Sequence, residues 1–162
     1  IRNNITLHNN KITPQEIDDI LELVGLRSLV NNLPNGVDEI VGYNRKNLSG
    51  GEMQKVAIAR ALVRKPRLLI FDEITNHLDQ ESQKTILNII TSLRGKVTIL
   101  FVSHDVAALK TLCQNVYVLG NGKMIEHGTM KMLLENPQTD WMKQFSMLSH
   151  KESRGEWKWE KL

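Results

Sequence analysis

The sequence predicts an α/β protein built around a parallel sheet, and three observations support this prediction. Residues 68–71 and residues 97–102 are apolar runs of strand length. Neither run alternates polar and apolar residues, which is typical of strands that are covered on both faces. A stretch with helical periodicity, residues 80–93, separates the two runs. A strand, a helix and a second strand in this order indicate parallel strands joined by a crossover helix.

The chain before the sheet is expected to be mainly helical. Residues 14–30 place apolar side chains at helical spacing, and Thr13 followed by Pro14 is a helix start signal. A loop rich in turn residues follows. A second helix is predicted from about residue 50 to residue 63, and Pro66 ends it.

A hairpin is expected after the two predicted sheet strands. Residues 116–119 and 123–126 would be its strands, and Asn121-Gly122 between them is favoured in tight two-residue turns. Two short helices and a mostly polar, loosely held tail are predicted to follow, over residues 129–135, 139–148 and 149–162, respectively.

The composition excludes several classes of protein. Hydrophobic residues make up 41% and charged residues 24%, the balance of a globular domain rather than a disordered chain. The net charge is only +3 and no dense basic stripe occurs, so we expect no nucleic-acid partner. Cys113 is the only cysteine, which excludes an internal disulfide or a cysteine zinc site. The apolar runs are too short to span a membrane, and no signal peptide is expected at residues 1–10.

Residues Leu48, Ser49, Gly50, Gly51 and Glu52 lead into the second predicted helix. Ser49 with Glu52 three residues later forms a capping box, which by itself is a structural feature. Two glycines exceed what a cap needs. They would let another molecule approach the backbone N–H groups of a helix N-terminus, which attracts anions. The segment is therefore a candidate phosphate-binding site.

Two carboxylates, Asp72 and Glu73, end the first apolar run. The carboxyl edge of a parallel sheet is where open α/β sheets bind ligands. One carboxylate can hold Mg²⁺ while the next polarises a water for attack on phosphorus. The alternative is a strand that merely ends in polar residues. His104 follows the second run, so it is expected at the same edge, although a lone histidine is more often structural or exposed.

Together these segments resemble the ATP-binding cassette (ABC) family. Residues 48–62 are similar to its signature sequence and following helix, residues 68–73 to its Walker B strand, residues 76–79 to its D-loop and residues 102–105 to its H-loop, in the family's order. The resemblance implies the C-terminal portion of a P-loop NTPase-like ABC ATPase fold, truncated at the N-terminus. It covers residue 1 to about residue 148. We expect a helical subdomain, a parallel-sheet core and a polar tail, over residues 1–66, 67–148 and 149–162.

The resemblance also implies roles for single residues. Asp72 would help to hold Mg²⁺, and Glu73 would be the catalytic base for the attacking water. His104 would contact the γ-phosphate of ATP, and Asp79 would couple the two sites of a dimer. The signature residues Leu48 to Glu52 would bind ATP held by the opposite nucleotide-binding domain, with Ser49, Gly50 and Gly51 gripping its γ-phosphate.

Several segments are similar to exporter-type cassettes in particular. They are residues 1–5, 33–38, 41–42 and 128–137. In that group the cassette works with a transmembrane domain, so the resemblance implies a place at the cytoplasmic face of the cell membrane.

The sequence departs from the family pattern in ways that bear on activity. No G-x-x-x-x-G-K-[ST] sequence occurs in residues 1–162, so no phosphate-cradling loop is present in them. We expect this chain alone to be inactive. Glu52 and Ile74 replace commoner residues of the family without altering the carboxylates. Residues 42–46 lack the acidic residue that exporters show after the glycine, and Asn76-His77 is reminiscent of soluble, translation-associated cassettes.

Two functions remain in competition. The first is the ATP-binding and ATP-hydrolysing component of an ABC exporter. The second is a non-catalytic remnant of a cassette that acts as a protein-interaction module. The acids Asp72, Glu73 and Asp79 with His104 favour the first.

Overall fold

The structure is a computed structural model that describes residues 1–42 and 48–153. Its contacts divide the chain into a first unit, Ile1–Val102, and a second unit, Ser103–Leu162, which are described separately. The expected boundary between helical and sheet parts at residues 66–67 lies inside the first unit. Residues 42–46, which lack the acidic residue of exporters, lie outside the described residues except for Gly42.

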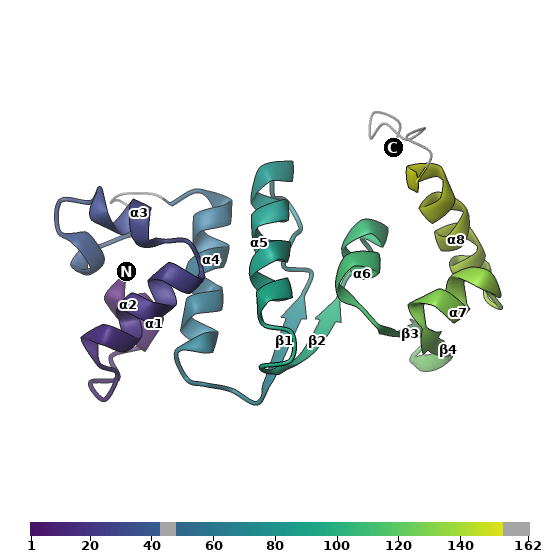
Figure 1. The fold of residues 1–162 in the computed structure, drawn as a ribbon, viewed down its shortest axis with the longest axis horizontal. Helices are drawn as coiled ribbons and strands as arrows, with labels where there is room; N and C mark the ends of the chain where they lie inside the picture. The colour runs from purple at the N-terminus through teal and green to yellow at the C-terminus, as the bar shows by residue number, and fades with distance from the viewer. Residues whose placement is uncertain (43–47, 154–162) are drawn as a thin grey trace. The chain divides into compact units, whose positions relative to one another are not determined.

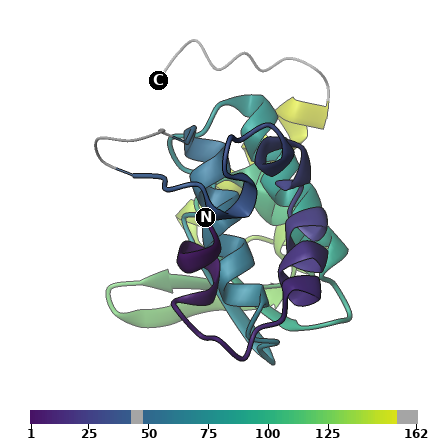
Figure 2. The same ribbon diagram turned by 90° about the vertical axis from the view of Figure 1, so that its left-hand side faces the viewer.

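The first unit begins with helices that pack on one another (Figures 1 and 2). They are α1 (Arg2–Thr6), α2 (Pro14–Leu23), α3 (Arg27–Asn31), the 3₁₀ turn η1 (Gly36–Asp38) and α4 (Gly50–Leu62). α1 and α2 both contact α4. The Nε of Arg60 on α4 donates to the backbone oxygen of Asn4 on α1 at 2.6 Å. Fully buried apolar side chains fill the space, among them Ile5, Ile17, Leu21, Leu26, Ile58, Ile86 and Ile90.

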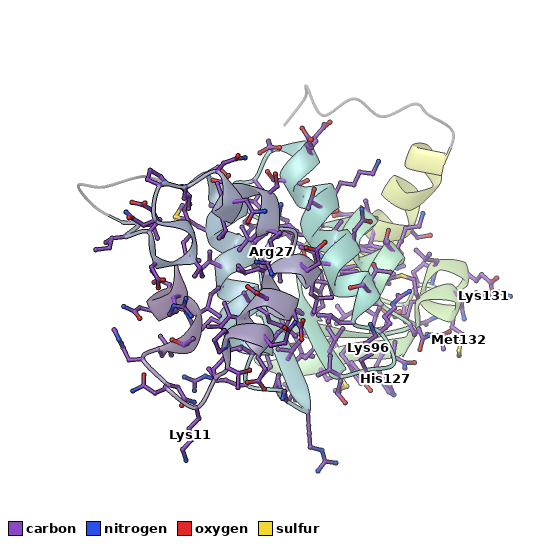
Figure 3. All side chains as sticks on the ribbon, turned by 60° about the vertical axis from the view of Figure 1, so that its left-hand side comes forward. Lys11, Arg27, Lys96, His127, Lys131 and Met132 are labelled. Carbon is purple, nitrogen blue, oxygen red and sulfur yellow. The ribbon has the colours of Figure 1, made fainter. Side chains whose placement is uncertain are left out.

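The helix predicted over residues 14–30 is interrupted. Its start is confirmed, with Pro14 in the first turn and a capping box between Thr13 and Glu16. Gly25 ends it, because its φ of 65° is in the left-handed region, which costs glycine little. The N–H of Leu26 then donates to the oxygen of Leu21 at 2.8 Å, and that of Gly25 to Glu22 at 3.0 Å. These two bonds are the Schellman motif that closes a helix C-terminus. Arg27 on α3 reaches back to α2 and pairs with Asp18 at 2.9 Å (Figure 3).

The predicted strand, helix and strand are confirmed. β1 (Leu68–Asp72) and β2 (Thr98–Val102) pair in parallel, with Leu68 opposite Thr98 and Asp72 opposite Val102. α5 (Gln80–Ser92) is the crossover between them (Figure 1).

In the described residues, only one face of the sheet is covered. Burial alternates along β1, with Leu69 and Phe71 buried and Ile70 61% exposed. On β2 the neighbouring side chains Leu100 and Val102 are exposed as well. Within the described residues, therefore, the expectation of two covered faces is wrong. The side chains on both faces of β1 are apolar, but only those on one face are packed against other described residues.

The second unit is built on an antiparallel hairpin. β3 (Asn115–Gly120) pairs with β4 (Lys123–Thr129), as predicted, and Asn121 and Gly122 form the turn with φ of 50° and 72°. Helices α6 (Val106–Leu112), α7 (Met130–Glu135) and α8 (Asp140–Ser153) complete it. α6 was not predicted, and its start is capped by Asp105. α8 is longer than predicted and includes the first residues of the expected polar tail. The rest of that tail, residues 154–162, lies outside the described residues.

One side of the hairpin is exposed. There the ring of Tyr117 on β3 stacks on the ring of His127 on β4, with ring centroids 6.1 Å apart. Figure 3 labels His127, together with Lys131 and Met132 of the neighbouring helix α7.

A buried carboxylate attaches α8 to the hairpin. Glu126 on β4 is only 8% exposed. It accepts hydrogen bonds from the backbone N–H of Gln138 at 2.8 Å, the N–H of Thr139 at 3.0 Å and the hydroxyl of Thr139 at 2.6 Å. The Thr139 oxygen in turn accepts from the N–H of Met142 at 3.1 Å. Burial alone would raise the pKa of Glu126, but the bonds from Thr139 and Gln138 outweigh it and hold the pKa below its ordinary value.

We predict that Glu126→Gln lowers the free energy of unfolding by about 1–3 kcal/mol at neutral pH, because buried donors lose their charged acceptor. The lowered pKa means that the carboxylate stabilises the fold above its unfolded-state pKa of about 4.3. That contribution is lost as the pH falls through the folded-state pKa, so the gap between wild type and variant should narrow in acid. Urea unfolding, followed by circular dichroism at several pH values, measures this difference in the free energy of unfolding. Glu135→Gln, at an exposed site, is the control, and an unchanged gap in acid would contradict the assignment.

Candidate functional site

The two adjacent acids at the end of β1 lie in different environments. Asp72 is the last residue of the strand and is exposed. Glu73 continues the pairing, because its backbone N–H donates to the oxygen of Val102 at 2.9 Å. It then turns the chain with a φ of 50°, which is strained for a residue other than glycine. Its Oε2 is buried from solvent. One carboxylate thus faces water, and the other is held partly inside the protein.

A tightly turned loop leads from Glu73 to α5. The N–H of Asn76 donates to the oxygen of Glu73 at 3.0 Å, and His77 has a second positive φ of 61°. Thr75 is only 1% exposed, and its backbone oxygen accepts from Nε2 of Gln83 on α5 at 3.2 Å. Strained residues that the surroundings hold in place are concentrated at functional sites. The loop is therefore a candidate for more than a connecting role.

Asp79 is the N-cap of α5. Its Oδ1 accepts from the backbone N–H of Ser82 at 2.9 Å, and its Oδ2 accepts from the Ser82 hydroxyl at 2.7 Å. These bonds lower the pKa of the exposed Asp79 carboxyl, with the N–H of Ser82 as the main cause. A cap is sufficient to explain an aspartate here structurally.

Ser49 is the N-cap of α4, and the predicted capping box with Glu52 is confirmed. The N–H of Glu52 donates to Ser49 Oγ at 3.2 Å, and the N–H of Ser49 donates to Glu52 Oε2 at 2.8 Å. Leu48 is half-buried, Gly50 exposed and Gly51 buried.

The two glycines have a packing reason that the sequence did not reveal. A Cβ built on Gly51 would lie 2.6 Å from Oγ of Ser82, and one on Gly50 would lie 3.2 Å from a methyl carbon of Leu78. Both neighbours are far along the chain, so no local pattern predicts the contact. The structure thus brings Leu48 to Glu52 beside the loop that carries Asp79, within the first unit.

Two helix N-termini lie side by side at this place. α4 and α5 pack against each other, and Figure 1 shows their first turns at the same end. Each N-terminus carries a partial positive charge that favours anions. His104, in contrast, belongs to the second unit, where it is exposed.

The described residues contain no group of three or more histidine, cysteine or acidic side chains arranged to hold a metal ion. Asp72 still fits Mg²⁺. That ion keeps several waters and is commonly held by one or two carboxylates together with substrate phosphates. An exposed carboxylate at the edge of the sheet meets this requirement.

Cavities in the described chain lie away from these residues. One of about 80 Å³ lies between the N-terminal segment and residues 38–41. Another of about 350 Å³, wide open, lies at the opposite end of the strands and is lined by Arg67 and Lys96. No helix in the described part of the chain has the length and apolar character to cross a membrane.

Comparison with known proteins finds similarity to the ATP-binding proteins of transporters. Residues 1–76 match the family model described as ABC transporter, and residues 46–110 match one described as an AAA domain, putative AbiEii toxin, Type IV TA system. The multidrug resistance-like ATP-binding protein MdlB of Buchnera aphidicola is 40% identical over 138 residues, 85% of this chain and 23% of that protein. The methionine import ATP-binding protein MetN 1 of Staphylococcus epidermidis is 38% identical over 139 residues, 85% of this chain and 38% of that protein.

A solved structure of a bacterial Atm1-family ABC exporter with ATP bound superposes with a TM-score of 0.77 at 28% identity. The match covers 91% of this chain and 25% of that one. The chain thus spans between about a quarter and two fifths of the length of these relatives.

We predict that Ser49→Ala lowers the free energy of unfolding by about 0.5–2 kcal/mol through loss of the cap on α4. Ser49→Asn should stay close to wild type, because asparagine caps equally well. Urea unfolding midpoints measure both, with Ser28→Ala, at an exposed serine of α3, as the control. Equal losses in the two Ser49 variants would show that the capping bond is not what Ser49 contributes.

Proposed function

Because this chain belongs to the ABC transporter family and is of the exporter type, we propose that it supplies ATP binding and hydrolysis to an export machine. The observation that carries the proposal is the pair Asp72 and Glu73 at the end of β1, one exposed and one partly buried. Asp72 is the last residue of β1 and Glu73 lies in the turn after it with a φ of 50°, so the two neighbouring carboxylates have different surroundings and can do different work.

The proposed division of labour follows from these environments. Asp72, exposed at the edge of the sheet, would bind Mg²⁺ together with phosphate oxygens and water. Glu73, held by the turn after β1, would accept the proton of the attacking water. A partly buried carboxylate has less competing solvent and a more fixed direction, which suits a general base. His104 would contact the γ-phosphate.

The signature residues Leu48 to Glu52 would serve the ATP of a second nucleotide-binding domain. Ser49 and Gly50 are exposed at the first turn of α4. Because the N–H of Ser49 donates to Glu52, the N–H of Gly50 and the hydroxyl of Ser49 would be the groups offered to a phosphate. Gly51 is buried against α5, so its lack of a side chain also serves packing. Asp79, next to this turn, would couple the two sites of the dimer.

The partners follow from the same proposal. They are a second nucleotide-binding domain, which completes the site, and the transmembrane domain of an exporter, which holds the assembly at the cytoplasmic face of the membrane. ATP and Mg²⁺ are the cofactors. No nucleic-acid partner is proposed.

The second candidate function is a non-catalytic interaction module. The observation in its favour is that residues 1–162 contain no phosphate-cradling G-x-x-x-x-G-K-[ST] sequence. The exposed apolar side chains Ile70, Leu100 and Val102 would serve contact with another polypeptide under either proposal.

We predict that residues 1–162 alone hydrolyse no measurable ATP and bind it only weakly, because they lack most of the groups that grip phosphates in this fold. Isothermal calorimetry on material of verified length is the measurement. Micromolar affinity for ATP would contradict this prediction.

We predict that Glu73→Gln in the complete protein slows single-turnover hydrolysis by about 10²–10⁴-fold while sparing ATP binding, since only the proton acceptor is lost. ATP should then hold two subunits together, which size-exclusion chromatography with ATP detects. Asp72→Asn should instead weaken Mg²⁺-dependent binding.

Glu81→Gln is the matched control, because Glu81 lies on the first turn of α5 and is exposed. Hydrolysis at the wild-type rate by Glu73→Gln would show that the base is another residue. An inactive wild type would favour the interaction module.

A further inference from the structure

We propose that Ser82 is a positioning residue, which fixes the first turn of α4 against Asp79 through a close fit with Gly51. The functional part of this proposal rests on the proposed function, whereas the fit itself does not. Ser82 lies outside the segments that resemble the family's motifs.

The hydroxyl of Ser82 has a fixed direction. It donates to Oδ2 of Asp79 at 2.7 Å, while the backbone N–H of Ser82 donates to Oδ1 at 2.9 Å. The backbone bond holds the Asp79 carboxylate at the first turn of α5, and the hydroxyl bond to that carboxylate then favours this one rotamer of Ser82.

Gly51 meets this fixed side chain. A Cβ on Gly51 would lie 2.6 Å from Ser82 Oγ and 3.0 Å from Ser82 Cβ, which is closer than packed atoms approach. Gly51 has no φ in the left-handed region, so its backbone conformation would accept another residue. The glycine is required by space alone.

A second contact flanks the first. A Cβ on Gly50, one residue earlier, would lie 3.2 Å from a methyl carbon of Leu78, which precedes Asp79 in the loop, so this contact is tight but less restrictive than that of Gly51. The first turn of α4 therefore rests on both sides of Asp79, against Leu78 before it and Ser82 after it.

This fit has a consequence for the proposed site. Ser49 and Gly50, which would touch the opposite subunit's ATP, and Asp79, which would couple the two sites, become parts of one rigid body. A displacement of about 1 Å at a reacting centre can cost about 10²-fold in rate. Ser82 would thus act on hydrolysis without touching ATP.

The test is a double-mutant cycle in the complete protein, with Gly51→Ala, Ser82→Gly and their combination. We expect Gly51→Ala to lower kcat at least about tenfold. The double variant should recover to the kcat of Ser82→Gly alone, since the nearest remaining atom of residue 82 would be its Cα at 3.9 Å and the hydroxyl bond to Asp79 is missing from both variants. Ser82→Ala should rescue only in part, because its Cβ remains 3.0 Å away.

Controls separate positioning from general damage. In one control, Gly51→Ala is combined with Glu81→Gly. This variant also introduces a glycine into the first turn of α5, but away from the contact with Gly51, so it should not restore the kcat lost in Gly51→Ala. Binding of ATP to the single subunit should be unchanged in every variant, so the loss should appear in kcat and in ATP-dependent dimerisation. Failure of Ser82→Gly to rescue Gly51→Ala would overturn the proposal, because the alanine would then act directly on ATP.

Urea unfolding of the same four proteins tests the fit independently of activity. Alanine in place of glycine ordinarily stabilises a helix, so a lowered midpoint in Gly51→Ala that Ser82→Gly reverses supports the contact. Strictly additive effects, or a raised midpoint in Gly51→Ala, would overturn it. A wild type that neither binds nor hydrolyses ATP would instead refute the proposed function.

Discussion

The parallel pairing of β1 with β2 is the constraint on which the rest of the first unit depends. It sets Asp72 opposite Val102, and one further bond, from Glu73 to Val102, defines where the strand ends and the turn begins. Parallel strands need a crossover, and α5 supplies it. The start of α5 then determines where Asp79 and Ser82 lie, and α4 packs against that start. A shift of the register by one residue would move the buried side chains of β1, Leu69 and Phe71, to the exposed face of the sheet.

The elements that local rules govern were predictable from the sequence. The helix start at Thr13-Pro14, the capping box at Ser49, the Asn121-Gly122 turn and the strand–helix–strand order all have signals within a few residues of one another. The break at Gly25 was missed because a lone glycine inside a helical pattern is compatible with either outcome until its φ is known. α6 was missed because its pattern is short.

The sequence predicted which residues make up the candidate site, but it predicted less well how they are arranged in space. The types and order of residues gave Asp72, Glu73, Asp79 and the signature segment. What they could not give is which atoms share the space between α4 and α5, because Gly51 and Ser82 come together only through tertiary packing. Which neighbour covers each face of the sheet is likewise set by tertiary packing. The sequence shows that a residue is apolar, but it does not show which neighbour covers it.

The backbone at Glu73 has a consequence for how this protein can be altered. A left-handed φ suits glycine and disfavours glutamate, so the fold gives up about 1–3 kcal/mol to keep a carboxylate at the end of β1. Selection for thermal stability alone would favour glycine at this position, and the proposed chemistry would be lost with the strain. Laboratory evolution of a more heat-resistant cassette would therefore need to hold position 73 fixed and gather its gains elsewhere.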